Sequence, residues 1–194
     1  MSLVRKPAPG FKSVAVIDKE FKEISLDDYK GKWVLLFFYP LDFTFVCPTE
    51  ITALSDKNEE FQDLNTQVIC CSVDSKYAHL AWINTPRKYG GVGDINFPLL
   101  SDLKKEIARD YDVLIDDKGR ALRAVFIIDP FGKVVLEIVH DLGIGRNVEE
   151  VLRSLKAIQA NYDTGEACPA NWQPGDDTLK EDPEGSKEYF SKHA

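Results

Sequence analysis

Two kinds of hydrophobic pattern alternate along the first half of the chain. Short apolar runs at Trp33–Tyr39 and Gln67–Val73 are typical of strands that are buried on both faces of a sheet. Between them, apolar side chains recur at helical spacings of three and seven residues, which predicts a helix over about Pro48–Leu64. A second helix is expected to carry Tyr77–Trp82. The pattern therefore predicts a strand–helix–strand–helix unit.

Hairpins are predicted on both sides of this unit. Val14–Ile17 and Phe21–Leu26 are separated by three polar residues, and Ala124–Asp129 and Lys133–Val139 flank a turn with Pro and Gly. Asn147 is the expected N-cap of a last amphipathic helix. This order of elements is the pattern of an α/β protein, a thioredoxin-like α/β sandwich with a mixed central sheet and an N-terminal hairpin.

The composition changes near the C-terminus. From Ala167 onward the chain is polar and is interrupted by Pro and Gly. We therefore predict a thioredoxin-like domain over 1–165 and a C-terminal tail over 166–194. The tail is too polar to form a core of its own, so it is expected to dock on this domain or on a neighbouring chain.

The charge balance excludes some partners. The 194 residues include 24 Lys and Arg against 32 Asp and Glu, a formal net charge of -8. Nucleic acids and anionic membranes need clustered basic residues, so neither is an expected partner. The longest apolar stretch, Trp33–Tyr39, is too short for a signal-peptide core or a membrane span. We expect a cytoplasmic protein, in which thiols are kept reduced.

Four cysteines stand in this setting, and two of them are adjacent. Cys70 and Cys71 lie in a predicted strand, so their side chains point to opposite faces and are expected to be core thiols. The sequence has no Cys-x-x-Cys pair, and its three His residues lie far apart. No metal and no other cofactor is therefore expected.

Cys47 has the sequence context of a reactive thiol. It follows a buried strand and a loop and precedes Pro48 at the predicted start of a helix, where unpaired N–H groups and the helix dipole stabilise a thiolate. Thr44 can place a hydroxyl beside the sulfur, although it could be a turn former only. Arg123, directly before an apolar strand, is the candidate buried cation. Cys168 lies near the start of the tail. Two readings stay open for it, a mobile second thiol and a thiol packed in the tail.

Five segments of the chain resemble the typical 2-Cys peroxiredoxins. They cover nearly the whole chain in the order of that family, and together they are far more specific than a single Thr-x-x-Cys motif. The segments are Phe38–Glu50, Asp74–Trp82, Phe126–Pro130, Gly145–Arg153 and Cys168–Trp172.

The resemblance implies a thiol-dependent peroxidase that reduces hydrogen peroxide and organic hydroperoxides. Cys47 would be oxidised to a sulfenic acid, and Cys168 of the partner subunit would resolve it as an intersubunit disulfide. A thioredoxin-like reductant would then reduce this disulfide. Pro40 would shield Cys47, while Thr44 and Arg123 would hold the thiolate and polarise the O–O bond.

The same resemblance implies supporting residues and an assembly. Glu50 and Arg146 would orient Arg123. A homodimer would form by edge pairing near Val134–Val139, with the tail docked on the partner subunit, and dimers would assemble into a decamer. Two further segments resemble those of overoxidation-sensitive members of the family, with Val92 in place of the usual Leu; their residues are Gly90, Gly91, Val92, Gly93, Tyr189 and Phe190.

Two other functions compete with a peroxidase. A dithiol oxidoreductase needs a second thiol three residues after the first, and Glu50 occupies that position. A ring-forming chaperone or redox-signalling assembly, in which the peroxidase activity is secondary, stays open. Two segments depart from the family pattern, Arg123–Phe126 and His140–Arg146. The second bears on details of the interface and not on the chemistry.

Overall fold

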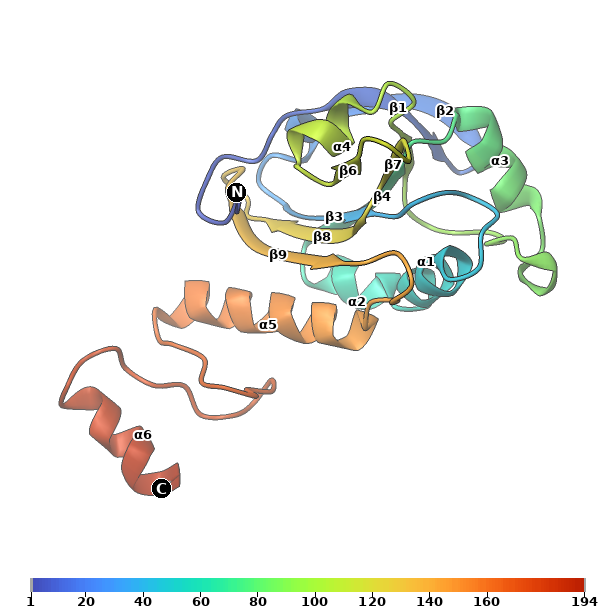
Figure 1. Ribbon diagram of the computed structural model, residues 1–194. Coiled ribbons are helices and arrows are strands. Elements are labelled where there is room, and N and C mark those ends of the chain that lie inside the picture. Colours follow the sequence, from blue (N-terminus) through green and yellow to red (C-terminus); the bar gives the residue numbers. More distant parts are fainter. Residues whose placement is uncertain (1, 194) are drawn as a thin grey trace. The chain divides into compact units, whose positions relative to one another are not determined.

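A seven-stranded mixed sheet organises the chain, in the order β2-β1-β5-β4-β3-β8-β9 (Figure 1). Its strands are β1 (Lys12–Ile17), β2 (Glu20–Ser25), β3 (Trp33–Phe38), β4 (Thr66–Ser72), β5 (Leu99–Ser101), β8 (Arg123–Ile128) and β9 (Val134–His140). β4 is parallel to both β3 and β5, whereas the outer pairs are antiparallel. The predicted α/β fold with a mixed sheet and an N-terminal hairpin is confirmed.

Helices cover both faces of the sheet. α1 and α2 lie on one side of β3 and β8, and α4 lies on the other (Figure 1). The helices are α1 (Cys47–Asp56), α2 (Asn58–Asp63), α3 (Lys76–Asn84), α4 (Glu106–Asp110), α5 (Val148–Thr164) and α6 (Gly185–His193). The remaining short elements are two 3-10 turns, η1 (Leu26–Tyr29) and η2 (Arg87–Tyr89), and a small ladder of β6 (Leu114–Ile115) and β7 (Arg120–Ala121).

The two adjacent cysteines sit in the core of this sheet. Cys71 belongs to the apolar cluster that includes α4 residues such as Ile107, and Cys70 lies outside that cluster. Both are fully buried, and burial raises the pKa of both thiols well above its ordinary value. The prediction that they are core thiols is confirmed.

The active-site helix and the tail differ from what the sequence predicts. The helix expected over Pro48–Leu64 begins at Cys47 and breaks at Lys57 into α1 and α2. At the break, the side-chain amide of Asn58 donates a hydrogen bond to the Asn96 carbonyl, which holds the chain in its new direction. The polar tail contains α6, a helix with no buried residue.

The structure, a computed structural model, describes residues 2–193 in two compact units. One unit ends at Arg146 and the other begins at Asn147, so α5 groups with the tail. The Asn147 side chain accepts a hydrogen bond from the Glu150 N–H, which confirms its predicted capping role. The division at residue 165 stays a prediction, and its outer limits, residues 1 and 194, lie outside the described residues.

Candidate active site

Cys47 is the first residue of α1 and is fully buried. The loop over 40–46 leads to it from the end of β3, and Pro40 at the start of this loop is also buried. A side chain at the first position of a ten-residue helix lies beside backbone N–H groups that have no partner within the helix. The local fold therefore places the sulfur where negative charge is stabilised.

Arg123 brings a positive charge to this sulfur. It is the first residue of β8, and its Nη1 donates to Cys47 Sγ at 3.4 Å and to Glu50 Oε2 at 2.7 Å. Its Nε donates to the Leu142 carbonyl at 2.8 Å. The guanidinium is thus held in one plane by partners from α1 and from the loop after β9. One N–H of the forked guanidinium therefore points to the thiol.

Glu50 and Arg146 form the buried ion pair behind Arg123. The two oxygens of Glu50 accept from Arg146 Nε at 2.9 Å, from Arg146 Nη2 at 2.9 Å and from the Arg146 backbone N–H at 2.8 Å. Burial alone would raise the pKa of Glu50, but the hydrogen bonds and charge of Arg146, together with Arg123, hold it below its usual value. Glu50 therefore stays ionised between two cations.

Arg146 also ties the site to the sheet. Its Nη1 donates to the carbonyls of Phe38 and Ala124, each at 2.7 Å, and its guanidinium carbon lies 3.3 Å from the centre of the Phe37 ring. These contacts come from the paired strands β3 and β8. The position of the Glu50 carboxylate is thereby fixed relative to the central strands.

The Thr44 hydroxyl is hydrogen-bonded within its own loop. Its hydroxyl donates to the Leu41 carbonyl at 3.0 Å. The intervening Phe43 has a left-handed backbone, with φ of 54°, which turns the loop at this point. Because the hydroxyl proton is committed to Leu41, the Thr44 oxygen offers its lone pairs as an acceptor.

A buried polar group under the loop escaped the sequence reasoning. His79 of α3 and Asp42 of the loop lie 2.8 Å apart, between His79 Nδ1 and Asp42 Oδ2, and the Tyr39 hydroxyl donates to Asp42 Oδ1 at 2.8 Å. The only signal in the sequence is one charged residue in an otherwise apolar loop, which does not identify its partner.

The remaining predicted site residues lie in other segments. Cys168 belongs to the second unit, where it is partly exposed and its thiol donates to the Ala157 carbonyl at 3.4 Å. Burial raises the pKa of Cys168, and the nearby charge of Arg153 opposes this rise. Tyr189 and Phe190 lie on α6 of the same unit, and Phe190 is exposed.

The glycine segment after α3 has a structural need for its glycines. A Cβ at position 91 would lie 1.9 Å from the Thr85 carbonyl oxygen, and Gly90 and Gly93 have φ of 80° and 64°. Val92 between them is fully buried. Only glycine fits these turns without strain.

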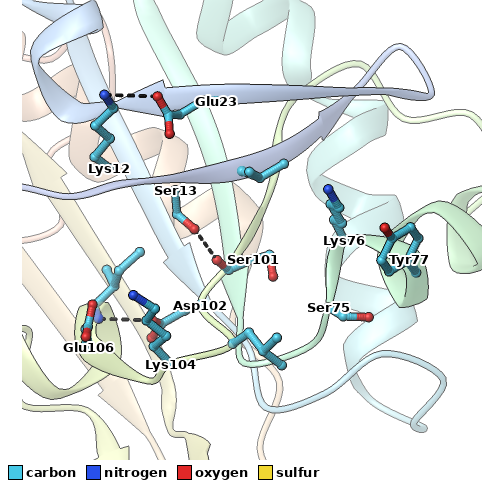
Figure 2. A pocket seen from close by; sticks show the side chains of 13 residues that line it. Lys12, Ser13, Glu23, Ser75, Lys76, Tyr77, Ser101, Asp102, Lys104 and Glu106 are labelled. Atoms are coloured by element: carbon cyan, nitrogen blue, oxygen red, sulfur yellow. Dashed lines mark hydrogen bonds and ion pairs between the residues drawn. The ribbon is translucent and has the colours of Figure 1, made fainter.

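A separate cavity of about 400 Å³ lies between β1, β2 and the start of α3 (Figure 2). Figure 2 shows Lys12 paired with Glu23 and the Ser13 hydroxyl donating to the Ser101 carbonyl at 2.6 Å. None of the predicted site residues lines it. Among residues 2–193, no group of three or more His, Cys, Asp or Glu could hold a metal ion, and no helix is long and apolar enough to cross a membrane.

Comparisons with known proteins agree with this geometry. Residues 4–137 match the model of the AhpC/TSA family, and residues 157–192 match the C-terminal domain of 1-Cys peroxiredoxin. The chain is 59% identical over 189 residues to the human mitochondrial thioredoxin-dependent peroxide reductase, covering 97% of this chain and 74% of that protein. It is 56% identical to bovine peroxiredoxin-2, covering 98% of this chain and 96% of that protein.

A solved structure extends the similarity to the fold. The reduced 2-Cys peroxiredoxin of Plasmodium vivax matches with a TM-score of 0.96 and 49% identity, covering 98% of this chain and 100% of that one.

The expected cytoplasmic location is contradicted by the same comparisons. Relatives from Homo sapiens, Mus musculus, Bos taurus and Drosophila melanogaster, at 56–60% identity, are named mitochondrial. The expectation rested on the absence of a long apolar run. A mitochondrial protein does not need one, because targeting segments to that compartment are amphipathic.

Proposed function

Because the chain belongs to the AhpC/TSA family and is a peroxiredoxin of the 2-Cys type, a thiol peroxidase, we propose that Cys47 is the residue that attacks the peroxide. The single observation that carries this assignment is the contact of a buried Arg123 guanidinium with Cys47 Sγ at 3.4 Å, at the start of a helix. Arg123 donates to the Cys47 sulfur, whereas burial raises the pKa of the Cys70 and Cys71 thiols well above its ordinary value.

The reaction at Cys47 needs stabilisation of the negative charge as it moves from the sulfur to the leaving oxygen. The thiolate attacks one peroxide oxygen, the O–O bond breaks, and the leaving oxygen takes a proton to become water or an alcohol, while Cys47 becomes a sulfenic acid. The Arg123 fork supplies donors where this negative charge develops. The Thr44 oxygen, whose proton points to Leu41, accepts from the O–H of the hydroperoxide.

We assign the second half-reaction to Cys168. Its thiol attacks the sulfenic acid of Cys47 on a partner subunit, releasing water and forming an intersubunit disulfide, and a thioredoxin reduces this disulfide by thiol exchange. Partial exposure of Cys168 and its place in the polar second unit support this role. The relatives named thioredoxin-dependent peroxide reductases support a thioredoxin as the reductant.

The proposed assembly is a homodimer that builds a decamer. β9 is the last strand of the sheet order, so one of its edges is unpaired within the chain. N-terminal residues contact β9 at more than one position: the Arg5 N–H donates to the Val134 carbonyl, and the Leu3 N–H donates to a carboxylate oxygen of Glu137. The end of the strand beyond Glu137, up to His140, is suited to pairing with the same strand of a second copy.

A mixing experiment tests the two cysteine roles together. Cys47→Ser and Cys168→Ser proteins are combined, treated with one equivalent of hydrogen peroxide and run on a non-reducing gel. Intersubunit pairing predicts a band of twice the chain mass in the mixture and none in either variant alone. Pairing within one chain predicts no such band, and full thioredoxin-dependent turnover by Cys47→Ser would refute the peroxidatic assignment. Cys70→Ala is the matched control and should behave as the parent protein.

A further inference from the structure

The loop that precedes Cys47 is fastened at Asp42 by three different parts of the fold. The Tyr39 hydroxyl at the end of β3 donates to Asp42 Oδ1 at 2.8 Å, and His79 Nδ1 of α3 lies 2.8 Å from Oδ2. The Asp42 backbone N–H donates to Asp74 Oδ2 at 2.9 Å. Asp74, in turn, accepts from the Ser72 hydroxyl at 2.7 Å. Asp42 therefore has partners directly after β3, on α3 and on the segment after β4.

The Asp42–His79 pair is a buried hydrogen-bonded pair. The side chains are 1% and 0% exposed, respectively. His79 Nε2 lies 3.3 Å from the Leu100 carbonyl, so both ring nitrogens lie beside acceptors. Burial raises the pKa of Asp42, and the hydrogen bond and charge of His79 oppose that rise. Removal of one partner would leave the other buried without its hydrogen bond, which is costly.

The contacts of Asp42 bear on the next residue of the loop. Phe43, which directly follows Asp42, has the left-handed φ of 54°, a strained conformation for a residue other than glycine. A strained residue persists only where its surroundings fix it. The contacts of Asp42 hold one side of Phe43, and the Thr44–Leu41 hydrogen bond holds the other. This turn decides where the Thr44 oxygen and the first residue of α1 stand.

We propose that His79 and Asp74 are positioning residues for peroxide reduction, because they fix the active-site loop through Asp42. The inference rests on the proposed role of Cys47. Neither residue touches the sulfur; each acts by setting the loop on which Thr44 approaches the reacting oxygens. Loss of either partner should slow the attack on a peroxide, which needs the loop, and should spare attack on an alkyl halide, which needs only the nucleophile.

Two matched pairs of variants test this. Asn places an amide N–H where His79 has Nδ1, whereas Gln reaches toward the position of Nε2 and leaves the Asp42 carboxylate without its partner. His79→Asn should therefore retain the peroxide rate that His79→Gln loses. At the half-buried Asp74, Asp74→Asn keeps an acceptor for the Asp42 N–H and Asp74→Ala removes it. Each full-length protein is assayed for oxidation of Cys47 by hydrogen peroxide and for its alkylation by iodoacetamide.

We expect the peroxide rate constant to fall about tenfold or more in His79→Gln and Asp74→Ala, with the alkylation rate within about twofold of the parent and the Asn variants near the parent in both reactions. A parallel fall in both reactions, or an unchanged peroxide rate in a folded His79→Gln or Asp74→Ala protein, overturns the proposal. If His79→Gln does not fold, the comparison of Asp74→Asn with Asp74→Ala alone tests the proposal. Cys47→Ser, run alongside, tests the proposed function separately, since peroxide turnover without Cys47 refutes that assignment whatever the loop variants do.

Discussion

Replacement of Glu50 by Gln tests whether the buried charge network holds the site together. Glu50 accepts four hydrogen bonds, three from Arg146 and one from Arg123, two on each carboxylate oxygen. Gln has nearly the same shape, but one of the two oxygens becomes an NH₂ group. Whichever way the amide turns, two donors of the arginines then face a donor instead of an acceptor.

The loss is set by these two contacts. Hydrogen bonds to charged groups contribute about 1.5–3 kcal/mol each, and removal of one partner of a buried ion pair costs about 3–5 kcal/mol. Both figures describe the same loss, so we expect the free energy of unfolding of Glu50→Gln to fall by about 3–5 kcal/mol. In either orientation Arg123 loses the negative charge that holds it at 2.7 Å, so the peroxide rate should fall as well.

Urea unfolding at one protein concentration measures the change in free energy, because subunit association makes stability depend on concentration. The pH dependence gives a second check. The pKa of Glu50 is lowered in the folded state, so as the pH falls the unfolded chain binds the proton first, near pH 4.3. The contribution of this carboxylate is complete above that pH and is lost as the pH falls through the folded pKa. The parent and Glu50→Gln should therefore differ most at neutral pH and converge in acid. A loss below about 1 kcal/mol at pH 7, or a difference that grows in acid, would refute the reasoning.

Three further changes have defined outcomes. Arg123→Lys keeps the charge but cannot reach both the sulfur and the Leu142 carbonyl in one plane, so the rate of peroxide consumption should fall about 100-fold or more; a rate near that of the parent would contradict the role of the fork. Gly91→Ala should lower thermal stability by about 2–3 kcal/mol, because its Cβ would meet the Thr85 carbonyl oxygen; unchanged melting would show that the turn can open. Asp102→Ala should cost about 1–2 kcal/mol, because the carboxylate accepts two backbone N–H groups of α4, and Asp102→Asn should recover part of the loss in the same melting assay.

The start of the active-site helix could be predicted within one residue, and its break could not. An apolar strand, a loop and Pro48 are local signals, and they place Cys47 at the helix mouth. The apolar spacing of Ile51, Leu54 and Phe61 continues through the break at Lys57, so periodicity alone sees one helix where the chain makes two. What turns the chain there is a contact with Asn96, far along the sequence.

Pairwise contacts between distant polar residues set the second limit. Arg123 was predictable as a buried cation because an apolar strand follows it directly. The Asp42–His79 pair has no such local mark, since the two residues are 37 positions apart and each looks ordinary in its own segment. The direction of the Thr44 hydroxyl depends on the left-handed backbone of Phe43, which no residue preference indicates. The tail helix α6 was missed because it has no apolar face to bury.

The buried charges of Arg123, Arg146 and Glu50 act together beside Cys47. Arg123 and Arg146 contribute two positive charges to the buried network, and Glu50 contributes one negative charge. One positive charge is left over, and besides Glu50 the Arg123 guanidinium contacts the Cys47 sulfur at 3.4 Å. This excess charge faces the sulfur inside the protein, where little solvent is available to screen it. Under the proposed mechanism the same guanidinium donates first to the sulfur and then to the leaving oxygen, so one buried cation serves the attack from its beginning to its end.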